Sequence, residues 1–291
     1  MIRVNKLMMK VYLMLDFQQI YKNRYGKEAE FGQLKIDIIG HLETILSRSS
    51  VRKFSKKTIS NELLSLLLTA AQSAPSKSNL QQYSILVIQD KLIKSKISNL
   101  IGNTKWALRA PLFFLFLADI RRNIKITKNK GYTHKNNNLD TFMNSVIDSA
   151  LSMQSMISAA ESIGLGICPI SMIRNIIDEV KIICDLPKGV FPIAGLSLGW
   201  PEEKSKISYR LPQDVVIHYN TYNDENLFDK IEEYDERVFK VDPISKEKQR
   251  HVNLYGIAER GTWSENISRQ LSVPERDKFK IWLKDHGFNL E

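Results

Sequence analysis

The apolar positions of the chain predict a helix-rich molecule. A helix over residues 33–47 is indicated by apolar side chains at helical spacing, at Leu34, Ile38, Leu42, Ile45 and Leu46. A second helix is expected to begin after Ser60, a typical N-cap residue, and to run to Ala71. The leucines of this second helix lie nearly all round it, which indicates a central and buried position.

Three further helices and three strands complete the regular part of the pattern. The helices are expected over residues 91–100, 139–163 and 175–184, and the strands over residues 84–88, 112–118 and 190–198. The strands are continuous apolar runs, which is typical of strands covered on both faces. Because helices separate the strands, the pattern favours an α+β or α/β sandwich with helices on both faces of a sheet.

Three regions have weaker patterns. Residues 1–33 lack the small-residue cleavage site of a signal peptide and are interpreted as an amphipathic arm. Residues 119–138 are basic, rich in Asn and without a usable apolar face, so an exposed loop or lid is expected. The tail from Tyr209 is expected to be irregular, with short helices. Gly164 and Gly166 are expected to end the 139–163 helix.

Composition narrows the class of protein and of partner. With 43% hydrophobic and 25% charged residues, the 291-residue chain is globular material. Its formal charge of +10 favours an anionic partner, whether nucleic acid, membrane surface or phosphorylated small molecule. No uncharged apolar run reaches the roughly 18 residues of a membrane helix. Cys168 and Cys184 lie in apolar runs, as expected of a soluble, cytosolic protein, and no metal site is predicted.

The motifs of several enzyme classes are missing from the sequence. There is no GxGxxG turn, no P-loop, and no HExxH or GxSxG motif. No pair of carboxylates stands out for acid–base chemistry. Any catalysis is therefore expected to rest on a bound cofactor rather than on a catalytic side chain.

Two loops have the composition that an anionic organic cofactor requires. The first, residues 48–52, places two arginines around two serines, and guanidinium groups offer phosphate a planar, permanently charged pair of donors. The second, residues 74–82, lies between a predicted helix and a predicted strand. Its hydroxyl and amide groups suit a heterocycle whose edges carry both donors and acceptors. A solvated loop and a Pro/Ser-rich turn are the alternatives.

The chain resembles a known family at these loops and beyond them. The segments that carry the resemblance, in order, are RSSVRKF, QSAPSKSNLQQYSILVIQD, AAESIGLGICPISMIRN and FPIAGLSLGWPEE. They are similar to the successive signatures of the FMN-dependent nitroreductase family. Later segments, YRLP, HYNTY, EEYDE and TWSENI, resemble the group A, oxygen-insensitive NADPH nitroreductases and NADPH–flavin oxidoreductases. The resemblance covers residues 34–288.

This resemblance implies a fold and an assembly. The expected fold is an α+β three-layer sandwich with a central, mainly antiparallel sheet flanked by helices, in an intertwined homodimer. Residues 34–291 would form one FMN-binding domain, whose C-terminal extension, about 209–291, wraps the partner subunit. Residues 1–33 would be an N-terminal arm.

The resemblance also implies cofactor-binding residues. Arg48, Ser49, Ser50 and Arg52 match the first FMN loop, although the chain reads Arg-Ser-Ser where many group A relatives read His-Arg-Ser. The second loop, which contacts flavin from the partner subunit, and a third segment are matched by further polar residues: Ser76, Ser78, Asn79, Gln81 and Lys105.

The remaining matches lie below the flavin and at the nucleotide. Ile170, Ser171 and Arg174 match the loop below the flavin, where Ser171 and Met172 replace the glycines of close relatives. Arg210 matches the arginine that binds the NADPH 2′-phosphate, and Arg260 is a second candidate for that phosphate.

The implied activity is a ping-pong reaction in which FMN accepts hydride from NADPH and reduces nitroaromatics, quinones or flavins. The alternatives within the resemblance are a flavin reductase that releases reduced FMN and a flavin-binding protein without turnover. A nucleic-acid-binding protein is the alternative from another class. It is disfavoured because the basic residues lack interleaved aromatic side chains, so neither nucleic acid nor membrane is an expected partner.

Overall fold

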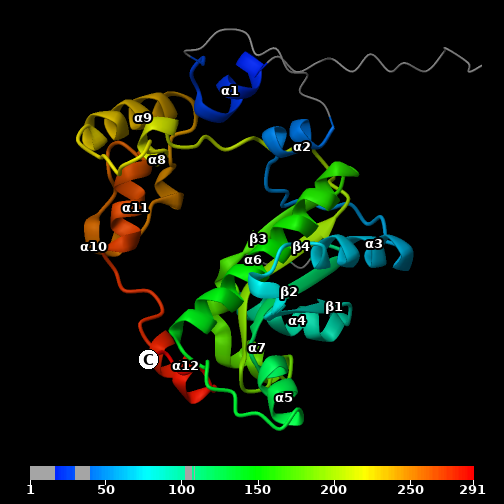
Figure 1. Ribbon diagram of the computed structural model, residues 1–291. Helices are drawn as coiled ribbons and strands as arrows, with labels where there is room; N and C mark the ends of the chain where they lie inside the picture. The colour runs from blue at the N-terminus through cyan, green and yellow to red at the C-terminus, as the bar shows by residue number, and fades with distance from the viewer. Residues whose placement is uncertain (1–16, 30–39, 102–106, 108) are drawn as a thin grey trace, which may run out of the picture. The chain divides into compact units, whose positions relative to one another are not determined.

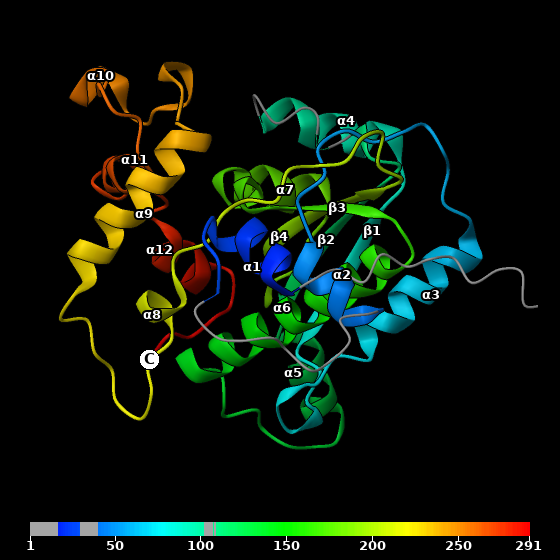
Figure 2. The same cartoon turned by 90° about the horizontal axis from the view of Figure 1, so that it is seen from above.

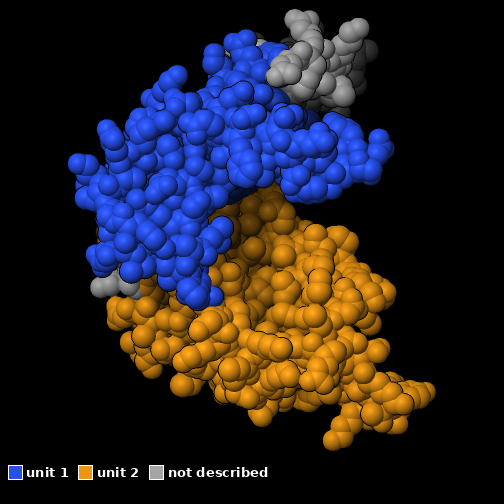
Figure 3. Space-filling view, turned by 90° about the vertical axis from the view of Figure 1, so that its left-hand side faces the viewer, with its two compact units in different colours: residues 1–48, 207–275 blue, residues 49–206, 276–291 orange. Residues whose placement is uncertain are grey.

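The computed structural model describes residues 17–29, 40–101, 107 and 109–291. The predictions for Lys105 and for residues 33–39 lie outside these ranges. The chain divides into two compact units (Figure 3), and it passes from one to the other after residues 48, 206 and 275. Unit 1 comprises residues 1–48 and 207–275, and unit 2 comprises residues 49–206 and 276–291.

Unit 2 is built on an antiparallel sheet of four strands in the order β1-β2-β4-β3. The strands are β1 (Tyr83–Ile88), β2 (Leu112–Asp119), β3 (Gly166–Ile170) and β4 (Val190–Gly199). Every residue of β2 and β4 is buried. The three predicted strands are therefore confirmed, and β1 and β3 form the two edges.

Helices cover both faces of this sheet (Figure 1 and Figure 2). On one face lie α3 (Asn61–Gln72), α6 (Leu139–Ser162) and α12 (Phe279–Asp285), and on the other lie α4 (Lys91–Leu100) and α7 (Ile177–Ile183). Alternate side chains of β2 point to opposite faces of the sheet and pack against the helices there. Phe114 belongs to the core on the α6 side and Phe113 to the core on the α4 side. This arrangement confirms the α+β three-layer sandwich.

Helix starts follow ordinary capping chemistry. The predicted N-cap Ser60 accepts a hydrogen bond from the Leu63 amide. Asp90 caps α4 and Asn138 caps α6 in the same way. The prediction that α3 is central and buried is wrong, however, because only Leu67 and Ala71 of this helix are fully buried and Leu66 is 57% exposed.

The strand β3 was not predicted, and the role expected for Gly166 is corrected with it. Gly164 follows α6 with a φ of 82°, as expected for a residue that ends a helix. Gly166 instead begins β3. A Cβ at Gly166 would lie 2.6 Å from Cγ2 of Val51, so the close approach of the first loop requires glycine here.

The expectation of a loop over residues 119–138 is also corrected. Residues Arg121–Asn129 form helix α5, and a loop follows over residues 130–138. Ile120 is buried and Ile124 packs against the core, so two apolar side chains suffice to attach this basic helix. Two 3-10 helices, η1 (Lys77–Asn79) and η3 (Ser171–Ile176), lie in the cofactor-loop candidates.

Unit 1 is helical. Its N-terminal part holds α1 (Phe17–Tyr25) and α2 (His41–Ser47), and its C-terminal part holds α8 (Gln213–Val216), α9 (Leu227–Val241), η4 (Lys246–Lys248), α10 (Val252–Tyr255) and α11 (Trp263–Leu271). The tail is more regular than expected, since α9 packs on α11 through the edge-to-face pair of Tyr234 and Trp263. The buried Asp235 accepts a hydrogen bond from the Ser264 amide at the start of α11.

Both cysteines are free. Burial raises the pKa of the Cys184 thiol to about 11, so it is protonated at neutral pH. The described residues include no cluster of His, Cys, Asp and Glu that could hold a metal ion. No helix in the described part of the chain is long and apolar enough to cross a membrane.

Candidate functional site

The second loop has an unusual backbone. Ser78, Asn79 and Gln81 have φ values of 50°, 54° and 51°, in the left-handed region that residues other than glycine seldom adopt. Such conformations persist only where surrounding contacts enforce them, and they concentrate at functional sites. All three side chains are exposed.

A buried carboxylate on α6 enforces this loop conformation. Asp148 is 1% exposed and accepts hydrogen bonds from Ser76 Oγ at 2.7 Å, from the Lys77 amide at 3.0 Å and from the Gln82 amide at 3.1 Å. Ser76 Oγ in turn accepts a hydrogen bond from the Gln81 amide at 2.8 Å. The Ser76 hydroxyl thus connects Asp148 to the backbone of the loop at Gln81.

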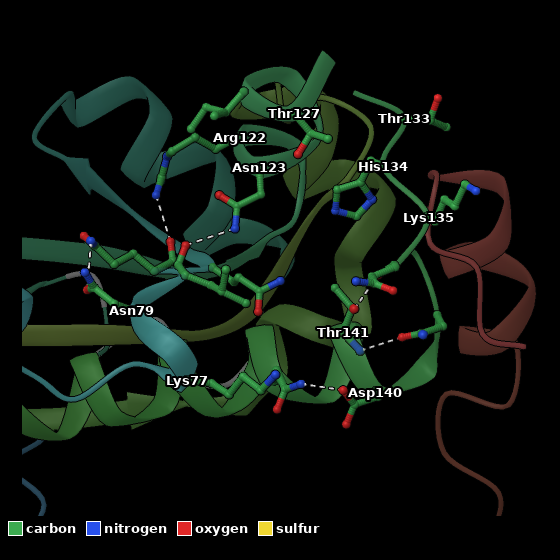
Figure 4. Close-up of a pocket in the computed structure, with 17 residues that line it drawn as sticks. Lys77, Asn79, Arg122, Asn123, Thr127, Thr133, His134, Lys135, Asp140 and Thr141 are labelled. Carbon is green, nitrogen blue, oxygen red and sulfur yellow. Dashed lines mark hydrogen bonds between the residues drawn. The ribbon is translucent and has the colours of Figure 1, made fainter. Parts of the chain in front are cut away.

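Helix α5 holds the loop from a second side (Figure 4). Arg122 Nη1 donates to the Gln81 carbonyl at 2.9 Å, and Asn123 Nδ2 donates to the Leu80 carbonyl at 3.0 Å. Arg122 Nη2 also donates to the Tyr83 carbonyl at 2.8 Å. Its carbonyls are bound by α5 and its amides by Asp148, so the backbone conformation of the loop is fixed and its polar side chains are held at the surface.

A cavity of about 710 Å³ opens between this loop, α5 and the first turn of α6 (Figure 4). Cations reach it from Lys77, Arg122 and Lys135. Gln82 is 3% exposed, and its Oε1 has no hydrogen-bond partner among the described atoms. The cavity is therefore polar and basic.

The first loop lies along β3. The Val51 amide donates to the Ile167 carbonyl at 2.9 Å, and Ser49 Oγ donates to the Ser205 carbonyl at 3.2 Å. Ser50 is half-buried and Arg52 is exposed. The contact with β3 brings residues 49–52 close to the strand that leads into η3.

The segment at η3 holds three predicted residues. Ile170 is buried and Ser171 is exposed. Arg174 donates a hydrogen bond to the Ile193 carbonyl, and burial, assisted by the nearby Arg276, lowers the pKa of its guanidinium group. Neither Ser171 nor Met172 has a positive φ, so the backbone here does not need the glycines of close relatives.

The strand order separates the two loops. The second loop leads into β1, whereas the first loop and η3 adjoin β3, and β2 and β4 lie between these edges. Three strand spacings of about 4.8 Å amount to about 14 Å across the sheet. Within unit 2 the first loop and η3 both adjoin the β3 edge, the loop beside the start of the strand and η3 after its end, and the second loop lies at the opposite edge.

In unit 1, Arg48 and Arg210 line one cavity of about 280 Å³, together with residues of α1 and α2. A neighbouring cavity of about 420 Å³ shares Arg210 and has aromatic walls, formed by Tyr25, Tyr209, Tyr234 and Trp263. Burial raises the pKa of Tyr234, so its hydroxyl stays neutral. An aromatic wall beside an arginine suits an aromatic anion.

The two candidates for the NADPH 2′-phosphate differ in their surroundings. Arg260 pairs with Glu236 and, at 3.8 Å, with Glu232. Arg210 is exposed and hydrogen-bonds the Ser208 and Tyr209 carbonyls, with no carboxylate partner among the described residues. Arg210 is therefore the better placed of the two to accept a phosphate.

Sequence reasoning missed the residues that shape the loops, chiefly Asp148 and Arg122. The signal for Asp148 was a lone acid among the small residues of α6, Ser145, Ser149 and Ser152, which are all buried. A charge on such a face must have partners, since an unpaired buried carboxylate is costly. Arg122 bonds two backbone carbonyls as well as Ser84 Oγ and Asp119, and the sequence held no comparable signal for its carbonyl contacts.

Comparisons with known proteins agree with this geometry. The nitroreductase family model matches residues 45–200, and the model of that family's C-terminal domain matches residues 208–291. The chain is 35% identical over 252 residues to an FMN reductase (NADPH) of Bacillus subtilis, a match that covers 85% of this chain and 98% of the relative. It is 30% identical to the oxygen-insensitive NADPH nitroreductase of Salmonella typhimurium, over 85% of this chain and 97% of the relative.

Solved structures give the same result. The NfrA1 nitroreductase of B. subtilis superposes with a TM-score of 0.77 at 34% identity, covering 86% of this chain and 99% of that one. The NADPH:FMN oxidoreductase of Vibrio harveyi, complexed with NAD⁺, superposes with a TM-score of 0.73 at 28% identity, covering 85% and 97%. From the matched models, the relatives and the shared fold, this chain belongs to the nitroreductase family, in its group A branch.

Proposed function

We propose that the protein is an FMN-dependent oxidoreductase that draws electrons from NADPH and reduces nitroaromatics, quinones or flavins. The observation that carries the proposal is the match over 98% of the length of an FMN reductase (NADPH). This match covers both the unit that contains the sheet and the C-terminal extension. It therefore includes the candidate FMN residues and the candidate NADPH residues. Bound FMN would supply two-electron redox chemistry, with NADPH as the donor.

The residues present fit this cofactor. A phosphate monoester needs cations, and Arg48 and Arg52 supply them from the first loop. The flavin ring edge needs both donors and acceptors, and the exposed amides of Asn79 and Gln81 offer both on a braced loop. Ser78 adds a hydroxyl at the same edge. Arg174 and Lys105 are further proposed contacts, together with Ile170 and Ser171.

A second copy of the chain is the proposed partner. The two loops lie at opposite edges of one sheet, which supports a composite site that takes the first loop from one subunit and the second loop from the other. Helix α6 carries an exposed apolar stripe at a spacing of four residues: Leu139, Met143, Ile147 and Leu151, each 38% to 53% exposed. Contiguous exposed apolar surface is typical of an interface, and we assign it to the homodimer.

Arg210 is the proposed contact for the NADPH 2′-phosphate, with Arg260 as the second candidate. The chain's residues would bind and orient the nucleotide, and their cations would stabilise negative charge on the reduced cofactor. Neither task needs a catalytic acid or base. A flavin reductase that releases reduced FMN is the second candidate function, favoured by the name of the B. subtilis relative.

The domain organisation remains a proposal as well. Residues 34–291 would be one FMN-binding domain with an extension from about residue 209, and residues 1–33 an arm. A cytosolic location is likewise proposed, on the reduced state of Cys168 and Cys184.

Flavin reconstitution tests the function. Protein stripped of small molecules and then mixed with FMN is expected to retain the flavin through gel filtration, with the absorbance of oxidised FMN and about one flavin per chain, as two composite sites in a twofold dimer require. It is then expected to oxidise NADPH when a quinone or nitroaromatic is added. Protein that retains no flavin under any condition in which it is folded would rule out the proposed function.

A further inference from the structure

Helix α1 lies outside the segments matched by the family models, which begin at residue 45. It is nevertheless built into unit 1. Gly26 ends the helix with a φ of 68°, and its amide donates to the Lys22 carbonyl at 2.8 Å. This ending presents Arg24, in the last turn, to two other segments of the unit.

Arg24 joins the segment that carries Arg48 to the segment that carries Arg210. Its Nη2 donates to the Arg48 carbonyl at 3.0 Å and to the Leu46 carbonyl at 3.2 Å. Its Nη1 donates to the Ser208 carbonyl at 3.2 Å, and its own carbonyl accepts from the Arg210 amide at 2.9 Å. One residue of the arm thereby bonds both sides of the cavity in which the two candidate phosphate ligands meet.

The arm also forms a wall of that cavity. The space of about 280 Å³ that Arg48 and Arg210 line is also lined by four residues of α1: Ile20, Tyr21, Arg24 and Tyr25. Three cationic side chains thus border this cavity: Arg24, Arg48 and Arg210. Three like charges in one cavity favour a strongly anionic ligand, such as a phosphate monoester.

We propose that Arg24 is a positioning residue for nucleotide phosphates, and that α1 is thereby part of the cofactor-binding machinery of this enzyme. Arg24 fixes the backbone at Arg48, the proposed FMN phosphate ligand, and at Ser208, two residues before the proposed NADPH 2′-phosphate ligand. The inference rests on the proposed function. Arginine is required because its planar fork reaches three carbonyls at once, which the single ammonium group of lysine cannot do in the same geometry.

The test uses full-length Arg24→Ala and Arg24→Lys, with Lys22→Ala as the control on the same helix. Lys22 is 57% exposed and pairs at 3.5 Å with Glu28 only on the surface of the arm. The measurements are KM and kcat for NADPH and for NADH at saturating FMN, and the Kd of FMN, taken from quenching of flavin fluorescence by the apoprotein. The thermal unfolding midpoint is measured alongside.

For Arg24→Ala we expect KM for NADPH and Kd for FMN each to rise about tenfold, equivalent to about 1.4 kcal/mol. kcat is expected to stay within about twofold of the wild type, since the residue does not touch the reacting atoms. Arg24→Lys is expected to restore little, and Lys22→Ala to behave as wild type.

Unchanged KM and Kd in Arg24→Ala, in an enzyme that is otherwise active, would overturn the inference and leave the proposed function intact. A lowered unfolding midpoint with unchanged KM and Kd would overturn it too, since it would show a structural role alone. Wild-type values of KM and Kd in Arg24→Lys would show that a positive charge alone is enough at this position. That result would also contradict the proposed positioning role. Wild-type protein that retains no FMN would instead defeat the proposed function itself.

Discussion

One buried carboxylate determines the shape of the second loop. Three residues in left-handed conformations cost on the order of 1 kcal/mol each. Asp148 offsets that cost by accepting hydrogen bonds from Ser76, Lys77 and Gln82. The strain is thus maintained by a residue on α6 rather than by the loop itself, and the exposed polar groups of the loop are positioned before any ligand arrives.

Asp148→Asn should therefore weaken both the loop and cofactor binding. The amide keeps the shape of the carboxylate but turns an NH₂ group toward a backbone N–H donor. We expect a loss of about 2 kcal/mol in the free energy of unfolding, as is typical when a buried hydrogen-bond partner is removed. Urea unfolding measures this loss, and limited proteolysis reports the opening of residues 76–82.

Asp140→Asn is the matched control for this change, because Asp140 lies exposed in the first turn of the same helix and bonds only a neighbouring side chain, Asn144, among the described contacts. Its expected cost is within about 0.5 kcal/mol. Equal costs at Asp140 and Asp148 would contradict the bracing role of Asp148.

Arg210→Ala should affect the KM for NADPH and the KM for NADH differently. If Arg210 binds the 2′-phosphate, its removal is expected to raise KM for NADPH by about tenfold or more, since charge-assisted hydrogen bonds contribute about 1.5–3 kcal/mol. KM for NADH, which lacks that phosphate, should change little. Arg260→Ala is the comparison, and a smaller effect is expected because Arg260 is engaged by Glu232 and Glu236. Equal effects of Arg210→Ala on both nucleotides would remove Arg210 from the phosphate site.

At the scale of elements, α6 serves two purposes with two faces. Its inner face packs on the sheet and carries Asp148, while its outer stripe of four apolar residues remains exposed in one chain. A helix that is polar outside would not need a partner, but this stripe exposes side chains of a size that a globular protein normally buries. In the proposed homodimer, α6 would therefore connect the shape of the second loop to the subunit interface.

Ile147→Glu is expected to disrupt the dimer, because it places a charge at the centre of the stripe. Sedimentation should then show a monomer, accompanied by loss of bound FMN if the site is composite. Ile182→Glu, at a 78% exposed position on α7, is the control and should leave the mass unchanged. A variant that stays dimeric and flavin-bound would contradict the assignment of the stripe to the subunit interface.

The sequence predicted the elements with strong local signals and missed those set by tertiary contacts. Helix α4 begins and ends at the predicted residues, and β2 differs by one residue at its end. Strand β3 was missed because it is short, contains Pro169 and is defined by pairing with β4. Helix α5 was missed because its charges outnumber its apolar residues, and the contacts that attach it, Ile124 on the core and Arg122 and Asn123 on the second loop, are tertiary.

The same division holds at the candidate site. Composition predicted the two loops and the family resemblance assigned their individual residues. The structure finds these segments in strained or well-anchored positions. The supports, Asp148, Arg122 and Arg24, were not predicted because each holds a loop through bonds to backbone atoms that are distant in the sequence. The pattern of side chains along the sequence does not indicate which distant backbone atoms a residue will bind.

For the whole molecule, the strand order is the feature with the largest consequence. It places the first and second loops at opposite edges of the sheet, so under the proposed function a single copy would present two halves of different sites. A twofold dimer would join each half to its complement and give two equivalent sites. Under the proposed function, the +10 charge would serve anionic cofactors at several arginines rather than one macromolecular partner.

Subunit complementation tests this composite site. Arg52→Ala damages the first loop and Gln81→Ala damages the second, and each variant alone is expected to have low activity. After mixing and subunit exchange, half of the dimers are mixed, and each mixed dimer contains one site built from two undamaged loops. About a quarter of the wild-type activity should therefore return, given the twofold symmetry. No recovery in verified mixed dimers would show that each site lies within one chain.

The central claim, that NADPH reduces FMN bound to this chain, is tested most directly by anaerobic stopped-flow mixing of the FMN-loaded protein with NADPH. The account predicts rapid loss of the oxidised-flavin absorbance, faster with NADPH than with an equal concentration of NADH, and its recovery when a quinone or nitroaromatic is added. Bound FMN that stays oxidised in the presence of saturating NADPH would contradict the account.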